Sequence, residues 1–523
     1  MPIAFIYASH ILLRHPVSVS RTTNENLFTL LRSAEMGVDL VPFLEVKGDA
    51  RMKRILVLSA LLLSLLTIPH ARADSAISQN EKLPSNHDQK ASANRFVHRA
   101  WSGRNDSLTC SPAPCVLPNV LITGEQAYNT ILIADPAKPS HLLAGLDSSY
   151  GSICPLGSVN GGKSWYLDQN GRCAGTTPSL AYGNKHTAYQ VGSNYNYGAE
   201  ITATSDNGNT WNTPIEAVSP LFSGGSVSTP WLAVDNSAKS RYANSLYVAA
   251  TQNYQVQSEI TVSYSRDGGS TWTMEIVDKV QVEPKVDHYS RVAVGSDGTV
   301  YVTWQRCEMT GDNVNCGGTK AHMWFSKSVD GGNAWSSPVE IAAVTLVPDS
   351  CHCAFFGNLP HTTDPVANPP LIAVDNSSGP NAGSLYVVVY NWVEKQMRVE
   401  VFTSQDGGTT WAKPVLVAPT FKNDEFFPGL SVSAAGMVGV NWLDRRNDSQ
   451  NIFYQPFAAV SNDGGKSFGT NYQLARPLSN PYYSSYSMGD YTGNAWSGKT
   501  LFVTWPDTRN AIMQDYVGGL LTK

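Results

Sequence analysis

Short apolar runs recur along this chain in pairs, and a polar turn separates the two runs of each pair. Leu232-Ala233-Val234-Asp235 is followed by Leu246-Tyr247-Val248-Ala249, and Val292-Ala293-Val294 is followed by Val300-Tyr301-Val302-Thr303-Trp304. Paired apolar runs of this length predict β-hairpins. The pattern returns at 131–147, 179–193, 371–392, 430–444 and 494–507, so the sequence predicts seven hairpins.

An eight-residue turn recurs six times between the hairpins. The copies begin at Ser158, Thr204, Ser265, Ser328, Ser404 and Ser461 and read Ser/Thr-x-Asp/Asn-x-Gly-x-Ser/Thr/Ala-Trp/Phe. The acidic or amide side chain caps N–H groups of its own turn, glycine takes a positive φ, and the aromatic ring returns to the core. Starts 46 to 76 residues apart predict one small antiparallel sheet per repeat, stacked radially.

These two patterns together predict an all-β fold, a β-propeller of four-stranded antiparallel blades at residues 95–523. Seven blades fit the hairpin count, and six remain the alternative if one hairpin is an excursion. The seventh unit ends near its third strand, between Ala511 and Leu520, and has no repeated turn. Pro118-Asn119-Val120-Leu121-Ile122 would supply its missing outer strand and remove an open sheet edge.

The N-terminal part of the chain has the pattern of an export signal. Residues 52–73 have a basic start, a short apolar run and Ala71-Arg72-Ala73, a small-x-small cleavage pattern. We therefore expect residues 1–51 to be a mis-assigned upstream segment, and N-terminal sequencing of the exported protein to begin at or near Asp74. Residues 74–94 then form a polar linker. A membrane anchor is the alternative, but the apolar run is shorter than the ~20 residues of a spanning helix.

Composition and cysteine spacing agree with a secreted or periplasmic protein that has no membrane span after signal cleavage. Of 523 residues, 42% are hydrophobic and 15% charged, and a net charge of −5 argues against nucleic acid as a partner. The cysteines form near neighbours that predict disulfides: Cys110 with Cys115, Cys154 with Cys173, and Cys307 with Cys316. Cys351-His352-Cys353 fits a disulfide or free thiols, with a metal as the minor alternative.

The predicted topology separates the loops into two faces. The first and third turns of each blade, which include the repeated turns, share one face, and the other loops share the opposite face, where we expect the chemistry. Three second-strand ends on that face carry similar motifs: Trp304-Gln305-Arg306, Trp442-Leu443-Asp444-Arg445-Arg446 and Trp505-Pro506-Asp507-Thr508-Arg509.

We interpret these motifs as a substrate-binding group in which guanidinium groups from several blades bind a carboxylate. The alternative is that each Asp–Arg pair only joins structural elements. The predicted substrate-binding set is Trp304, Arg306, Trp442, Asp444, Arg445, Arg446, Tyr491, Asp507 and Arg509.

A tyrosine-rich segment, Tyr482 to Tyr491, enters the last blade and supplies the catalytic candidates. A tyrosine paired with a carboxylate can attack an anomeric centre that already bears a negative charge. We therefore assign the catalytic set to Tyr486, Glu425 and Asp490. The alternative is that the tyrosines stack on sugars or fill the core.

The repeated turns across 158–468, behind a signal sequence, resemble the Asp boxes of secreted bacterial Asp-box (BNR-repeat) proteins of the sialidase superfamily. Asp444-Arg445-Arg446-Asn447 and Gly489-Asp490-Tyr491-x-Gly493 also resemble segments of its sialidase-like members. The resemblance implies an arginine triad, an Asp acid and a Tyr–Glu nucleophile pair. The family's first triad arginine lies in an Arg-Ile-Pro segment, and this sequence has none.

Two functions from different classes follow. The first is an exported, sialidase-like glycoside hydrolase acting on an acidic or complex glycan. The alternative is a non-catalytic propeller that binds a glycan or a protein on the same face. The partner is a glycan or glycoprotein in the first case; no cofactor or metal is predicted, and calcium in an Asp-rich loop stays open.

Overall fold

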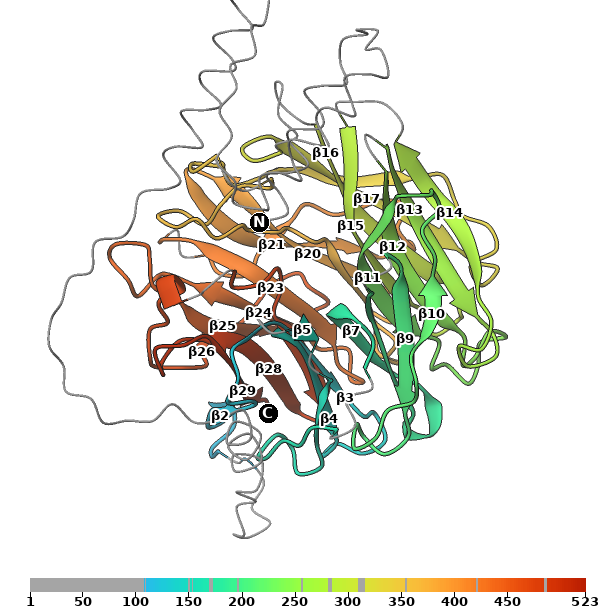
Figure 1. The fold of residues 1–523 in the computed structure, drawn as a ribbon. Helices are drawn as coiled ribbons and strands as arrows, with labels where there is room; N and C mark the ends of the chain where they lie inside the picture. The colour runs from blue at the N-terminus through green and yellow to red at the C-terminus, as the bar shows by residue number, and fades with distance from the viewer. Residues whose placement is uncertain are drawn as a thin grey trace, which may run out of the picture. The chain divides into compact units, whose positions relative to one another are not determined.

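The computed structural model describes residue 108 and residues 110–523, except 149–150, 153, 169–172, 195–196, 255–256, 281–284, 309–315, 353–354, 420–421 and 484–486. The upstream segment, the signal sequence and the linker lie outside the described residues. The described chain forms seven antiparallel sheets arranged as the blades of a propeller (Figure 1). No described helix has the length and hydropathy of a membrane span.

Five blades, numbered 2 to 6, follow one another in chain order with four strands each. Blade 2 contains β7 (Thr176–Tyr182), β8 (Ala188–Ser193), β9 (Ala199–Thr204) and β10 (Ile215–Val218), with the short 3₁₀ helix η1 (Asn184–His186) between its first two strands. Blade 3 contains β11 (Ser226–Val234), β12 (Leu246–Tyr254), β13 (Gln257–Ser265) and β14 (Thr273–Val280). Blade 4 contains β15 (Lys285–Val294), β16 (Val300–Glu308), β17 (Lys320–Ser328) and β18 (Val339–Thr345).

Blades 5 and 6 keep this order but have very short outer strands. Blade 5 contains β19 (Leu371–Val374), β20 (Leu385–Val393), β21 (Gln396–Ser404) and β22 (Val415–Leu416). Blade 6 contains β23 (Glu425–Val432), β24 (Val438–Asp444), β25 (Gln455–Ser461) and β26 (Tyr472–Gln473), and η2 (Pro481–Tyr483) follows it. Blade 1 is less regular and contains β3 (Ala127–Ala134), β4 (Leu142–Ser148), β5 (Gly151–Ser152) and β6 (Leu156–Ser158).

Blade 7 joins the two ends of the described chain. Its strands β27 (Gly493–Ser497), β28 (Thr500–Asp507) and β29 (Gln514–Leu521) come from the C-terminus, and β1 (Cys115–Val116) and β2 (Val120–Leu121) pair with the free edge of β29. Figure 1 shows the blue β2 beside the red β28 and β29. The predicted seven blades and the predicted closure by residues 118–122 are both confirmed.

All six repeated turns connect the third strand of a blade to its outer region, as expected from the sequence. In the copy that begins at Ser265, the Asp267 carboxylate accepts hydrogen bonds from Ser265 Oγ at 2.7 Å and from the Thr271 N–H at 2.9 Å. Gly268 and Gly269 have φ values of 74° and 98°, which a side chain would strain. Trp272 packs against the apolar core between blades 2 and 3, so the turn fixes its blade to a neighbour.

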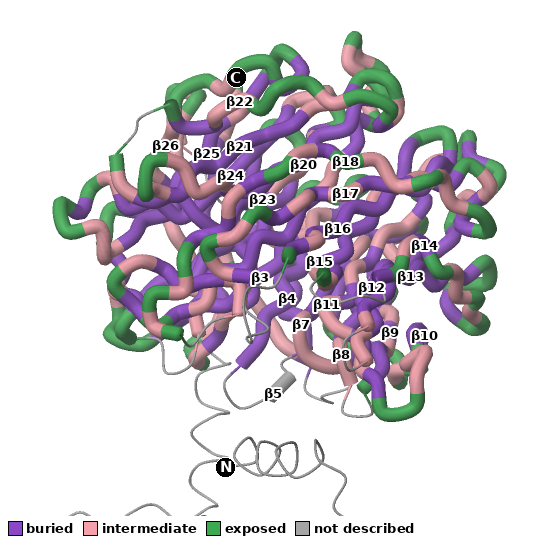
Figure 2. The backbone as a smooth tube through the Cα atoms, turned by 90° about the horizontal axis from the view of Figure 1, so that it is seen from above, coloured by how far each residue is buried: buried purple, intermediate pink, exposed green. Residues whose placement is uncertain are grey.

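The hydrophobic core lies between neighbouring sheets. Val191 and Ile201 of blade 2, for example, pack against Leu246 and Val248 of blade 3. Figure 2 shows buried backbone along the strands and exposed backbone at the turns around the rim. Because each sheet packs against its neighbours, most of the two faces of a blade is closed to a ligand.

Three predicted disulfides are present and hold loops of the propeller. They join Cys110 to Cys115, Cys154 to Cys173, and Cys307 to Cys316. Cys351 is also disulfide-bonded, so its thiolate is not free to bind a metal. Cys353 lies outside the described residues.

Candidate functional site

A cleft of about 460 Å³ opens on the face opposite the repeated turns. Three segments meet there: the start of β3, the connection between β18 and β19, and the connection between β26 and β27. The residues that line it are Tyr128, Asn129, Thr363, Pro365, Ser487, Gly489 and Asp490. The cleft is therefore on the face where the sequence analysis placed the chemistry.

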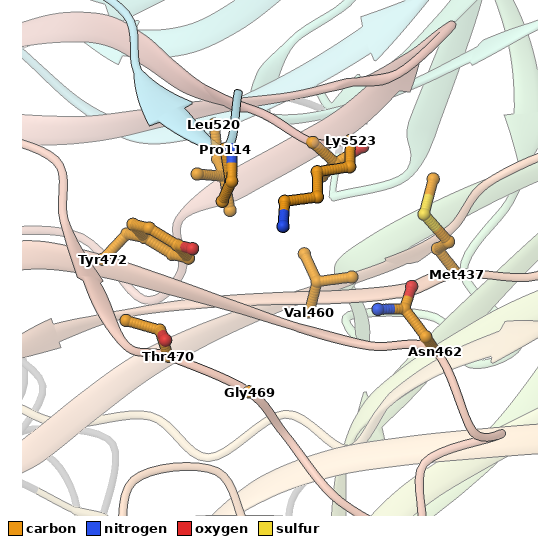
Figure 3. A pocket seen from close by; sticks show the side chains of 10 residues that line it. Pro114, Met437, Val460, Asn462, Gly469, Thr470, Tyr472, Leu520 and Lys523 are labelled. Atoms are coloured by element: carbon orange, nitrogen blue, oxygen red, sulfur yellow. The ribbon is translucent and has the colours of Figure 1, made fainter. Parts of the chain in front are cut away.

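Two further pockets in the described part of the chain offer less chemistry. A pocket of about 190 Å³ lies between blades 6 and 7, where Met437, Val460 and Leu520 give it an apolar lining and Lys523 is its charged residue (Figure 3). A groove of about 430 Å³ lies between the repeated turns of blades 5 and 6, on the opposite face from the cleft, and includes Trp411 and Lys466. Neither lining contains an acidic residue.

The inner strands are distorted near the cleft. Five of them have a shift in register close to the start of the strand. A residue other than glycine has a positive φ at each shift: Asn129 at 53°, Thr177 at 51°, Thr229 at 47°, Tyr289 at 58° and Phe427 at 48°. This conformation is costly for such residues, and bulges of this kind redirect side chains and are common beside functional sites.

Asp490 is the acidic residue of the cleft and is partly exposed there. Its N–H donates to Asn129 Oδ1 at 2.5 Å, and Asn129 Nδ2 donates to Asp147 Oδ2 at 2.9 Å. The Thr177 N–H donates to both oxygens of Asp147, at 2.8 and 3.0 Å. A single row of contacts therefore joins the segment before blade 7 to blades 1 and 2.

The acidic groups of this row titrate at unusually high pH. Removal from water raises the pKa of Asp490, and the positive charge of Arg291 acts in the opposite direction. Burial also raises the pKa of Asp147 to about 6, with hydrogen bonds from Asn129 and Thr177 opposing the change. A carboxyl whose pKa is raised holds its proton to a higher pH, which is the property that a general acid needs.

Arg291 on β15, the inner strand of blade 4, is fully buried. Its Nη1 donates to Ser290 O at 2.9 Å, while Nε and Nη2 have no hydrogen-bond partner among the described residues. The guanidinium carbon lies 4.2 Å from the ring centre of Trp231 and 5.9 Å from that of Tyr491. Burial lowers the pKa of Arg291 to about 10, so the group is still cationic at neutral pH.

Tyr491, a predicted substrate-binding residue, packs into this group. Its ring meets Trp231 edge to face at 5.6 Å, and its hydroxyl donates to Pro178 O at 3.1 Å. Residues from blades 2, 3 and 4 and from the segment entering blade 7 thus meet around Arg291. The tyrosine is 3% exposed, so it contributes mainly to packing around the Arg291 guanidinium.

The three arginines at second-strand ends have carboxylate partners. Arg446 Nε donates to Asp444 at 2.9 Å, and Arg509 Nε and Nη2 donate to Asp507 at 2.9 and 2.6 Å. Arg306 contacts two carboxylates, Asp287 at 2.7 Å and Asp278 at 2.7 Å. These ion pairs are local, as the alternative interpretation expected.

The repeated Trp-x-Asp-x-Arg motif has a physical explanation in these contacts. Trp442 Nε1 donates to Asp444 at 2.7 Å, and Trp505 Nε1 donates to Asp507 at 2.9 Å. Both tryptophans are fully buried, as is Trp304 in blade 4. Each Asp in the two complete motifs thus accepts hydrogen bonds from the indole before it and the guanidinium after it, which satisfies a buried charge.

We expect Arg509→Ala to lower the free energy of unfolding by about 3–5 kcal/mol, because the fully buried Asp507 would lose its cationic partner. Denaturant unfolding of the variant and wild type measures the loss. A carboxylate clamp predicts a different result: unchanged stability and a loss of about 1.5–3 kcal/mol in the binding of an acidic ligand.

Arg445 and Glu425 lie between loops and blades rather than in the cleft. Arg445 Nη1 is 3.6 Å from Asp424 and donates to Pro360 O at 2.9 Å and to Asn451 O at 2.8 Å. It therefore holds the long connection between β18 and β19 against blade 6.

Glu425 is 1% exposed, accepts a hydrogen bond from the Val399 N–H at 3.0 Å and lies 3.7 Å from Arg398. Burial raises its pKa to about 8. Glu425 on blade 6 thus contacts blade 5, whereas Asp490 contacts blade 1. Tyr486, the third member of the predicted catalytic set, lies outside the described residues.

Asp515 on β29 is a buried acid at the closure of blade 7, where its backbone carbonyl accepts a hydrogen bond from the Ile122 N–H. Its two carboxylate oxygens have no hydrogen-bond partner among the described residues. Burial raises its pKa to about 8, and the charges of Asp147 and Asp507 add to the effect. The folded protein therefore keeps a proton on Asp515 at a pH where the unfolded chain has released it.

This difference predicts that stability falls as pH rises from about 4 to about 8, by at most about 1.4 kcal/mol per pH unit for one proton. In Asp515→Asn the contribution of this group should disappear. Unfolding free energies measured at several pH values test the prediction, and an identical pH slope in the variant would contradict it.

The predicted topology places Arg291, Asn129 and Asp147 on the face that carries the chemistry, but the sequence assigned none of them a role in the site. Arg291 carries a weak signal, because it is an arginine at the start of an apolar inner strand, Val292-Ala293-Val294. Asn129 and Asp147 carry only their place at strand ends on that face, which other polar residues share. No group of three or more metal-binding side chains suited to an ion occurs in the described part of the chain.

Comparisons with known proteins give fold likenesses at low identity. No protein-family model and no curated protein match the chain. A polysaccharide lyase, described as a PL25 ulvan lyase, is 10% identical with a TM-score of 0.47, and the match covers 76% of this chain and 95% of the lyase.

Two further solved structures are similar over about two thirds of the chain. The α-L-arabinofuranosidase of Fusarium graminearum is 12% identical with a TM-score of 0.41, covering 66% of this chain and 92% of that enzyme. The intramolecular trans-sialidase of Ruminococcus gnavus is 11% identical with a TM-score of 0.40, covering 65% and 93%. At these values the comparisons assign no activity to this chain.

Proposed function

We propose that this protein is an exported, sialidase-like glycoside hydrolase that acts on an acidic or complex glycan. The observation that carries the proposal is Asp490, a partly exposed carboxyl in the cleft whose pKa is raised. The six repeated turns and the resemblance they carry support the same reading, and the three disulfides support export.

Asp490 would donate a proton to the leaving-group oxygen of the scissile glycosidic bond, which is the role of the general acid in glycoside hydrolysis. The acid must be protonated, so turnover should fall as pH rises through the raised pKa of Asp490. Arg291 is cationic, and its Nε and Nη2 have no hydrogen-bond partner among the described residues. Its positive charge, which acts on Asp490, would favour a negatively charged glycan at the cleft.

A panel of fluorogenic glycosides tests this function, with sialosides and uronic-acid glycosides beside neutral ones. Both the full chain and the form that begins at Asp74 should be assayed. Release of fluorophore from an acidic glycoside supports the proposal, and an absence of turnover across the panel by folded protein contradicts it.

A non-catalytic glycan-binding propeller is the second candidate, and one observation favours it. Asp490 lines the cleft, but Glu425, the second predicted carboxyl, is buried between blades 5 and 6. Binding to a glycan array without turnover would support this reading. Tyr486→Phe separates the two classes further, because a nucleophile loses turnover with its hydroxyl whereas a stacking ring keeps its binding.

A further inference from the structure

The Asn129 side chain can bridge Asp490 and Asp147 in one orientation only. Its Oδ1 accepts from the Asp490 N–H, and its Nδ2 donates to Asp147 Oδ2. A rotated amide would place NH₂ against an N–H donor and its oxygen against a carboxylate. The amide is 5% exposed, so water does not readily replace either partner.

The backbone before Asp490 approaches Asn129 very closely. A Cβ on Gly489 would lie 2.6 Å from both the N and the Oδ1 atom of Asn129, and Gly489 has a φ of 90°. This distance is shorter than real Cβ contacts, so only glycine fits here. The segment that carries Asp490 therefore rests directly on β3, and its place in the cleft depends on Asn129.

Asp147 is held in turn, with little freedom to rotate. The Thr177 N–H and Asn129 Nδ2 bind its two oxygens, and the residue is 4% exposed. The ionisable groups that interact electrostatically with Asp147 are Asp490, Asp515 and Tyr491, and Arg291 interacts with Asp490. Asp147 thus places a carboxyl at a fixed position behind the one in the cleft.

From these contacts we propose that Asn129 and Asp147 are positioning residues that fix the Asp490 carboxyl in the cleft. Asn129 sets the position of the Asp490 backbone, and Asp147 orients the Asn129 amide. Above its pKa of about 6, Asp147 also adds a negative charge behind the cleft. This inference rests on the hydrolase activity proposed above. It adds two residues to the site, and neither is proposed to contact the cleaved bond. Asn129 lines the cleft, whereas Asp147 does not.

Hydrogen–deuterium exchange tests the pair without any need for turnover. In full-length Asn129→Ala, exchange in the peptide that contains Asp490 should become at least about 10-fold faster, since its N–H loses a buried acceptor. Asn368→Ala is the matched control, because Asn368 is also a buried amide with two backbone bonds, both to Tyr390 in blade 5. Unchanged exchange in Asn129→Ala, or the same change in the control, would overturn the proposal.

Kinetics on a glycan that the wild type cleaves provide the second measurement. Asn129→Ala should lower kcat by about 10²-fold with a smaller change in KM, the size expected when a reacting group is displaced by about 1 Å. In Asp147→Asn the loss of a neighbouring negative charge should lower the apparent pKa of the alkaline limb of the pH profile. A purely structural role would leave the apparent pKa of the alkaline limb unchanged. An unchanged apparent pKa in Asp147→Asn would therefore refute the proposed role of Asp147.

The two proposals can fail separately. If the folded wild type cleaves no glycan, the hydrolase function fails, while the exchange experiment still decides whether Asn129 fixes the Asp490 segment. If the wild type cleaves a glycan but both variants keep its exchange rates and pH profile, the positioning role fails and the hydrolase function stands.

Discussion

Asp490→Asn is expected to lower kcat/KM on a cleaved glycan by about 10²–10⁴-fold, the range for loss of a general acid–base group. The physical reason is that an amide has the shape of the carboxyl but cannot donate the proton to the leaving group. Asp490 is partly exposed to the cleft, and removal from water favours its protonated form. The alkaline limb of the pH profile should also be lost in the variant.

Glu275→Gln is a suitable control for this measurement. It removes one acidic charge from β14, the outer strand of blade 3, far along the chain from the cleft residues. The control should retain wild-type kcat/KM, and both variants should unfold at the wild-type temperature. Wild-type turnover by Asp490→Asn would remove this residue from the catalytic set.

Deletion of residues 95–123 is expected to destabilise the entire propeller, because it removes β1 and β2 from the edge of β29. Leu117 and Ile122, which are 2% and 5% exposed, leave the core with these strands. Burying two such side chains contributes about 3–6 kcal/mol. The deletion also removes the backbone hydrogen bonds from Leu117 to Gly519 and from Ile122 to Asp515. A loss of this size is a large part of the 5–15 kcal/mol typical of a folded domain.

Thermal unfolding of the deletion variant measures this effect, with a chain that begins at residue 108 as the control. Since the deletion could prevent folding altogether, Leu117→Ala and Ile122→Ala provide a milder test, each with an expected loss of about 2–5 kcal/mol. A melting temperature unchanged by the deletion would show that the closure does not hold the ring together.

The fold was predictable from the sequence because its signals are local and repeated. The hairpins around Leu232–Ala249 and Val292–Trp304 occupy β11–β12 and β15–β16, and each repeated turn has its own capping Asp or Asn and glycine. The closing strand was predictable for a different reason: the last unit lacked an outer strand, and Val120–Leu121 was the unassigned apolar run.

The site was predicted less well, because its contacts depend on which strand faces the centre. Arg446 and Arg509 follow second strands, where Asp444 and Asp507 meet them two residues away. Arg291 instead begins the regular part of an inner strand, directly after a bulge at Tyr289. No residue pattern in the sequence predicts this bulge. The contact of Asp490 with Asn129 joins segments 361 residues apart in the sequence, so local sequence patterns cannot predict it.

The pairing of Val120 with Val517 also has a consequence for the order of events during synthesis. Blades 2 to 6 can each form as their own four strands emerge, since their pairings are local. Blade 7 cannot be completed until the last residues have left the ribosome, so the early strands β1 and β2 must wait unpaired. A nascent chain stalled before β29 would keep an open ring, with its N-terminal strands free to pair with other chains.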